Sequence, residues 1–171
     1  MEKLLWIDME MTGLDVEREV VIEVAAVVTD MTLQPLDQYH SVVKQPAKYL
    51  DGMDDWNQKH HRESGLIDLI PSGKAPNVVE SDLLGILDQH FANERAVLAG
   101  NSIGQDRLFI NKHFGQFASR LHYRMLDVTS YKIMFVNRFN IAYEKKNTHR
   151  AVDDINESIA ELNHYLSHIR A

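Results

Sequence analysis

The order of apolar and polar positions predicts a small sheet followed by alternating strands and helices. Three strand-like runs open the chain, over residues 3–10, 20–30 and 36–43, and turn signals at 12–13 and 32–35 separate them. Because these runs are rich in apolar and β-branched residues and their connections are short, we expect a three-stranded meander.

The remaining three quarters of the chain contain all of the predicted helices. Residues 50–59 have a helical pattern, whereas residues 64–77 contain two glycines and two prolines and are expected to form an irregular, exposed connection. Further along we expect a helix over 78–91, a strand over 96–99, a helix after Gly100-Asn101 and a strand over 124–127.

A final helix is expected over residues 150–169, because apolar residues recur there with a period near 3.6. This apolar stripe consists of Ala151, Ile155, Ile159, Leu162, Leu166 and Ile169. The alternation of strands and helices predicts an α/β fold, and the lack of repeats or of a linker-like stretch predicts a single domain over residues 1–171.

Composition and charge limit the chemistry. With 44% hydrophobic residues the chain can bury one sizeable core, and with no cysteine it has no disulfide, thiolate nucleophile or cysteine-bound zinc, which suits a reducing cytoplasm. No run approaches the ~20 apolar residues of a membrane span, so we expect a cytoplasmic protein with no membrane partner. The net charge of −7 disfavours a protein that coats long nucleic acid, but not one that holds a short substrate through metal ions.

Two carboxylates end the first predicted strand. Strand geometry sends alternate side chains to one side, so Asp8 and Glu10 project together, and their oxygens suit magnesium or manganese. Asp15 and Glu17 have the same spacing, but they lie in a predicted loop where they can face water. Carboxylates at the end of an apolar strand are costly to bury without a partner, which makes the first pair the better candidate for a metal site.

The final helix distinguishes between its two adjacent aspartates. Each helical residue turns by ~100°, so relative to Ile155 at the centre of the stripe, Asp154 lies about 100° away and Asp153 about 160° away. We therefore expect Asp154 to flank the buried face and Asp153 to be solvated.

Asp106 and His149 have weaker individual signals. Phe109 and Ile110 place Asp106 beside the apolar side of its helix, which follows a plausible cap at Asn101-Ser102. Taken alone, Asp106 fits a capping or ion-paired aspartate better than a metal ligand. In the same way, His149 taken alone fits a solvent-exposed loop histidine better than a catalytic one.

Together these residues resemble the DEDDh exonucleases in order and spacing. Asp8, Glu10, Asp106 and Asp154 match the four acids of that family, and His149 matches its histidine. Five segments are similar to the oligoribonucleases within it: LWIDMEMTGLD (5–15), MDDWNQKHHRESGL (53–66), AGNSIGQD (99–106), LHYRMLDV (121–128) and THRAVDDINESIAEL (148–162). Residues 133–146, IMFVNRFNIAYEKK, depart from the Arg-Arg-Trp-Pro-like pattern of the family.

The resemblance implies a ribonuclease H-like exonuclease fold, in which helices flank a mixed five-stranded sheet, and a homodimer whose subunits complete each other's substrate pockets. It also implies that Leu14 and Trp56 pack on the bases of a dinucleotide, with Tyr123 contributed by the neighbouring subunit. The implied contacts of the 5′ phosphate are His61, Ser102, Arg124 and Thr129, which would favour 5′-phosphorylated dinucleotides. Four of these residues also have an ordinary structural interpretation: Leu14 and Trp56 as packing residues, Tyr123 as a core tyrosine, and Arg124 as a surface ion-pair partner.

The resemblance further implies 3′-to-5′ hydrolysis of short RNA to nucleoside 5′-monophosphates, with two divalent ions, Mg²⁺ or Mn²⁺, held by the four acids. His149 would take the proton of the attacking water, a role that suits an ordinary pKa of ~6.5. Two alternatives stay open: a DEDDh enzyme that trims DNA or longer RNA through a more open pocket, and a noncatalytic nucleotide-binding or dimeric interaction protein with the same fold.

Overall fold

The computed structural model describes residues 2–144 and 151–169. The predicted proton acceptor His149 lies outside the described residues.

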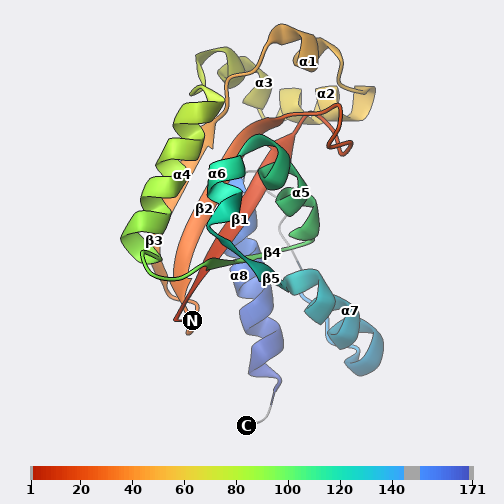
Figure 1. Ribbon diagram of the computed structural model, residues 1–171. Helices are drawn as coiled ribbons and strands as arrows, with labels where there is room; N and C mark the ends of the chain where they lie inside the picture. Colours follow the sequence, from red (N-terminus) through yellow and green to blue (C-terminus); the bar gives the residue numbers. More distant parts are fainter. Residues whose placement is uncertain (1, 145–150, 170–171) are drawn as a thin grey trace.

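A mixed five-stranded sheet forms the centre of the molecule (Figure 1). Its strands are β1 (Lys3–Met11), β2 (Val21–Asp30), β3 (Pro35–Val42), β4 (Ala96–Gly100) and β5 (Leu121–Asp127). The order across the sheet is β3-β2-β1-β4-β5; the first three strands pair antiparallel, and β4 and β5 are parallel to β1. The predicted meander and the predicted mixed sheet are therefore confirmed.

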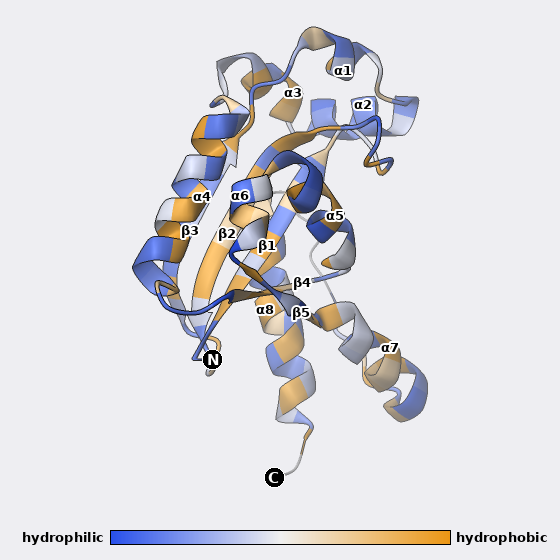
Figure 2. Cartoon of the chain, viewed as in Figure 1, coloured by the Kyte–Doolittle hydropathy of each residue, from blue (hydrophilic) through white to orange (hydrophobic). Residues whose placement is uncertain are grey.

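Helices cover both faces of this sheet. The helices on one face are α4 (Pro76–His90), α5 (Gly104–His113) and α6 (Gly115–Ser119), and α8 (Ala151–Ser167) crosses the other face (Figure 1). Alternate side chains of β1 reach both layers: Ile7 packs with the first group and Trp6 with α8. Figure 2 shows the hydrophobic colour along most of β2 and in bands along α4 and α8.

The segment after β3 differs from the sequence-based prediction. Instead of one helix over 50–59 there are two, α1 (Ala47–Asp51) and α2 (Asp55–Glu63), because the chain turns at Gly52 and Asp54 caps the second helix by accepting from the Asn57 N–H. The predicted irregular, exposed connection was wrong in part. It contains α3 (Leu66–Leu69) and a 3₁₀ turn (Ile70–Ser72), and Leu66 and Ile70 are buried in a cluster with β2.

Two further helices were not predicted: α6 and α7 (Val128–Phe139). The predicted cap of α5 at Asn101-Ser102 was also wrong, because the residue before α5 is Ile103 and its side chain makes no capping bond. None of the described helices is long and apolar enough to cross a membrane. The cytoplasmic location stays a prediction.

Candidate active site

The face of β1 that packs on α8 changes from apolar to acidic along the strand. Leu4 and Trp6 are buried against α8, and the next two residues on that face are Asp8 and Glu10, which are only partly buried. The change comes where α8 begins, with the small residues Ala151 and Ala25 buried beside it. The fold thus leaves room for charge at the end of β1.

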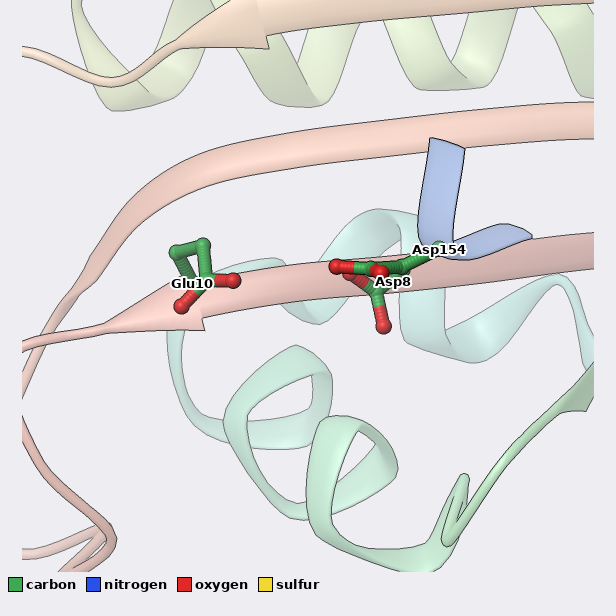
Figure 3. A group of neighbouring side chains, drawn as sticks. All are labelled: Asp8, Glu10 and Asp154. Atoms are coloured by element: carbon green, nitrogen blue, oxygen red, sulfur yellow. The ribbon is translucent and has the colours of Figure 1, made fainter. Parts of the chain in front are cut away.

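Asp154, in the first turn of α8, completes a cluster with these two acids (Figure 3). Carboxylate oxygens of Asp8, Glu10 and Asp154 all lie within 4.8 Å of one another. Asp153 is exposed, whereas Asp154 is partly buried, as the helix geometry predicted. Three hard oxygen donors at such distances fit Mg²⁺ or Mn²⁺, which prefer carboxylate ligands.

Asp106 approaches the same strand from α5 but is not part of this three-residue group. Its Oδ1 accepts a hydrogen bond of 3.1 Å from the Met9 N–H, in the part of β1 beyond its described pairing with β4 at Leu5 and Trp6. Burial raises the pKa of Asp106 to about 7, against the opposing effect of this bond. The fourth predicted acid therefore lies beside the cluster, close enough for its charge to affect Glu10.

Burial and the neighbouring negative charges raise the pKa of Glu10. Burial, followed by the negative charges of Glu23 and Asp154, raises the pKa of Glu10 to about 7. A divalent cation would relieve this repulsion, so the donor set fits the metal that the sequence predicts.

Glu23 was missed by sequence reasoning. It pairs with Glu10 across β1 and β2, is buried, and its Oε1 lies 2.7 Å from His40 Nε2 on β3. The one available signal was an acidic residue within the otherwise apolar run VIEVAAVV. Its partner could not be seen in the sequence, because strand pairing brings residues 23 and 40 together.

His61 also lies against the cluster. The side chain is buried, with Nε2 3.0 Å from the Met11 carbonyl oxygen and Nδ1 4.0 Å from Glu10 Oε2. Because a carbonyl only accepts, Nε2 is the nitrogen that carries the proton, and Nδ1 faces Glu10. Burial lowers the pKa of His61, which favours this neutral form.

Two exposed apolar side chains belong to segments that adjoin the cluster. Leu14 is 75% exposed in the turn after β1, where its carbonyl accepts from Gln105 Nε2, and Trp56 is 68% exposed on α2. One ring face of Trp56 stacks on His60, with centroids 4.8 Å apart and planes 8° apart. Exposed apolar surfaces of this kind suit contact with nucleobases.

Ser102 and Thr129 meet where β4 and β5 end. The Ser102 N–H donates to Asp127 Oδ1 (3.0 Å) and Thr129 Oγ1 (2.9 Å), and the two hydroxyls are 3.2 Å apart. Both residues line a hollow along α7 that also contains Lys132. A cationic side chain near two hydroxyls is a favourable setting for a phosphate.

Tyr123 and Arg124 lie elsewhere, on the edge strand β5. Tyr123 is 75% exposed, and the Arg124 guanidinium lies over its ring at 5.3 Å. Since Met125 and Leu5 both pair with Leu98 of β4, Tyr123 is level with the start of β1. It is therefore on the order of 15 Å along the strand direction from the acids, and two strands across. The structure does not bring these two residues to the acid cluster.

The amino-acid sequence of this chain is similar to those of known exonucleases. The RNase T family model, described as an exonuclease, matches residues 5–162. An oligoribonuclease of Shewanella sp. (strain W3-18-1) is 41% identical, with 97% of this chain and 94% of that protein covered, and the oligoribonuclease of Pseudomonas aeruginosa (strain UCBPP-PA14) is 40% identical, with 98% and 96% covered.

Solved structures resemble this chain in fold. Exonuclease I of Methylocaldum szegediense has a TM-score of 0.70 at 17% identity, with 95% of this chain and 40% of that chain covered. A zinc-bound complex of Escherichia coli exonuclease I with single-stranded DNA has a TM-score of 0.69 at 12% identity and the same coverage. The chain thus corresponds to about two fifths of these larger proteins, and the predicted ribonuclease H-like exonuclease fold is confirmed.

Proposed function

This chain belongs to the oligoribonuclease family of exonucleases, and we propose that it removes nucleotides from the 3′ end of short RNA, dinucleotides above all, and releases nucleoside 5′-monophosphates. The observation that carries the proposal is the cluster of Asp8, Glu10 and Asp154, whose oxygens lie within 4.8 Å of one another. The cluster lies at the end of a central strand, and α8 starts beside it. Near full-length similarity to the oligoribonucleases also supports the proposal. We also propose that residues 1–171 form one exonuclease domain, because the described residues are organised around a single sheet.

We further propose that Asp8, Glu10, Asp106 and Asp154 hold two divalent ions, Mg²⁺ or Mn²⁺. When bound, such ions supply positive charge that stabilises the attacking and leaving oxygens of the phosphodiester. Asp106 orients its carboxylate through the bond to the Met9 N–H, and this bond keeps one oxygen turned toward β1. His149 would accept the proton of the attacking water, as its place in the motif implies.

Short substrates are favoured by what surrounds the acids. Leu14 and Trp56 would contact the two bases through apolar surfaces that make no demand on base identity. Ser102 and Thr129, with His61 and Arg124, would surround the 5′ phosphate and so close the pocket beyond the second nucleotide. Arginine suits this position because it can meet a phosphate through two parallel hydrogen bonds.

The same arrangement supports a homodimer. Tyr123 is exposed on an edge strand and remote from the acids of its own subunit, so a second subunit is the natural site of its contact with bases. Exposed apolar residues on the neighbouring α7 are further surface that a partner can cover. They are Ile133, Met134 and Phe139.

The direct test is a time course with 5′-labelled RNAs of two to twenty nucleotides, with and without a chelator. We expect the 5′-phosphorylated dinucleotide to disappear fastest, with nucleoside 5′-monophosphates as products and no reaction in chelator. Slower cleavage of the dinucleotide than of a 20-mer, or faster cleavage of DNA than of RNA, would instead support an enzyme that trims longer ends. DNA is included because one of the similar exonuclease I structures is a complex with single-stranded DNA. Binding of short RNA by folded protein in Mg²⁺ or Mn²⁺ without hydrolysis would support the noncatalytic alternative.

A further inference from the structure

A network of buried polar groups runs from the interior of α8 to the turn that contains Ser102. At its inner end Glu161 is completely buried and accepts two hydrogen bonds of 3.1 Å, one from the Tyr165 hydroxyl and one from Asn101 Nδ2. Burial, followed by the bond to Glu161, raises the pKa of Tyr165 to about 12, so this hydroxyl stays a donor. Burial of a carboxylate costs free energy unless its oxygens are hydrogen-bonded, so these bonds are needed to keep Glu161 inside the protein.

The direction of each hydrogen bond follows from the groups involved. Ser158 Oγ donates its proton to the Asp154 carbonyl oxygen at 2.8 Å, so toward Asn101 Nδ2, also at 2.8 Å, it is an acceptor. The Glu161 carboxylate is an acceptor as well. The amide nitrogen of Asn101 therefore faces two acceptors, and its orientation is fixed from inside the protein.

A fixed Asn101 amide also fixes the next residue outward. Because its nitrogen points inward, Asn101 Oδ1 points to Thr129 Oγ1, which donates to it at 3.3 Å. Thr129 has then used its only proton, and its oxygen accepts from the Ser102 N–H at 2.9 Å. This bond holds Ser102 at a φ of +51°, a left-handed conformation that a serine rarely adopts without support.

The outer end of the network is the Ser102 side chain. Its hydroxyl is exposed and lies 3.2 Å from Thr129 Oγ1, which already receives the Ser102 N–H. Of these two hydroxyls, Ser102 is therefore the one whose proton remains available to an incoming phosphate oxygen.

We propose that Glu161 is a positioning residue for recognition of the 5′ phosphate: acting through Asn101 and Thr129, it holds the strained Ser102 turn so that the Ser102 hydroxyl donates to the phosphate. The inference rests on the proposed function and extends it to residues that do not touch substrate. Of the two acceptors that face Asn101 Nδ2, the Ser158 hydroxyl can also donate, so the Glu161 carboxylate is the one that enforces the polarity of the chain. A carboxamide at position 161 could present its nitrogen to Asn101 and allow the amide to turn over.

The test compares two substrates, a 5′-phosphorylated and a 5′-hydroxyl dinucleotide, and measures the ratio of their kcat/KM values. Ser102→Ala should lower this ratio by about tenfold, the loss expected when one hydrogen bond to a charged group is removed. Glu161→Gln should lower it at least about threefold, mainly through KM of the phosphorylated substrate. The double variant should be no worse than Ser102→Ala, because Glu161 acts through Ser102.

Tyr165→Phe is the matched control. It removes a hydroxyl that bonds the same carboxylate but leaves the orientation of Asn101 unchanged, so Tm should fall while the substrate ratio stays at the wild-type value. A ratio that falls equally in Tyr165→Phe would mean that the network contributes only general rigidity, and the proposal would be wrong. An unchanged ratio in folded Glu161→Gln would overturn it as well.

Asn101→Ala provides an independent route if Glu161→Gln does not fold. It removes the amide that links Glu161 to Thr129, and its loss should again not add to that of Ser102→Ala; additive losses would show that Asn101 acts separately and would contradict the proposal. A wild-type protein that hydrolyses neither dinucleotide would refute the proposed function itself. If the wild-type protein prefers the phosphorylated substrate and folded Glu161→Gln keeps that preference, only this inference is refuted.

Discussion

Two chemically identical neighbours on α8 differ only in the direction of their side chains. Asp154 shares the cluster with Asp8 and Glu10, whereas Asp153 is exposed. We predict that Asp154→Asn lowers kcat on a 5′-phosphorylated dinucleotide by at least about 10²-fold, since it removes a carboxylate that would hold the divalent ions. Asp153→Asn should change kcat by less than about twofold. The two variants remove the same charge one residue apart, so equal losses would contradict the assignment.

The raised pKa values of Glu10 and Asp106 predict how stability depends on pH in the metal-free protein. Both carboxyls have a pKa of about 7 when folded, above the ordinary values of 4.5 and 3.8. Between about pH 4 and pH 7 the folded state therefore binds more protons than the unfolded state, and the free energy of unfolding falls as pH rises through this window. Each group should account for about 3–4 kcal/mol, fully present below about pH 4 and lost as pH rises through 7.

Thermal unfolding in chelator at pH 5.5 and pH 8 measures this dependence. We expect a lower Tm at pH 8, and a smaller difference in Asp106→Asn, which has no charge to bury. Adding Mn²⁺ should raise Tm most at pH 8, because cations and protons compete for the same oxygens. A metal-free protein whose Tm rises between these two pH values would show that the acids are not strained by burial and mutual repulsion.

The segment after β3 depends on a close approach of two backbone segments at Gly73. A Cβ at Gly73 would lie 2.8 Å from the Val42 carbonyl oxygen and 2.9 Å from the Lys44 nitrogen. We predict that Gly73→Ala lowers the free energy of unfolding by about 1–3 kcal/mol, because backbone must move. Gly85→Ala, in the exposed middle of α4 with nothing within 4 Å, should raise it by about 0.5–1 kcal/mol. Denaturant unfolding of both variants is the measurement, and a neutral Gly73→Ala would contradict the packing described.

The elements that could be predicted are those whose pattern is local. The strands and α4 are apolar runs or one-sided stripes bounded by turn residues, and α8 has a clear period. By contrast, α7 has apolar residues on several sides, Ile133, Met134 and Phe139 among them, all exposed in this chain. Such a helix has no one-sided pattern to detect. Leu66 and Ile70 were missed for another reason: they are buried by β2, far away in the sequence.

The candidate site divides in the same way. Strand and helix geometry alone placed Asp8 with Glu10 and chose Asp154 over Asp153. That the two elements bring their acids together came from the family resemblance, because no local rule relates residue 10 to residue 154. Glu23 escaped notice because its importance arises from pairing with β1. The same limit applies to Glu161, whose helical pattern shows burial but not the partner in the β4–α5 turn.

The proposed completion of each site by a second subunit can be tested by complementation. Tyr123→Ala and Asp154→Asn should each be nearly inactive as homodimers: the first provides no tyrosine to its partner, and the second has no intact acid cluster. In a heterodimer, the Tyr123→Ala subunit keeps its own acids and receives Tyr123 from the Asp154→Asn subunit. One of the two sites is then complete, and about half of the wild-type activity should return.

Two affinity tags, one on each subunit, allow the heterodimer to be purified and its kcat on a dinucleotide to be measured. The matched control pairs Asp8→Asn with Asp154→Asn. Both changes lie in one acid cluster, so each site of that heterodimer has a damaged cluster and no activity should return. If the Tyr123→Ala and Asp154→Asn heterodimer is as inactive as its parents, the tyrosine does not cross the interface. We expect the Tyr123→Ala and Asp154→Asn heterodimer to regain activity, because within one subunit β4 and several residues of strand separate Tyr123 from the acids.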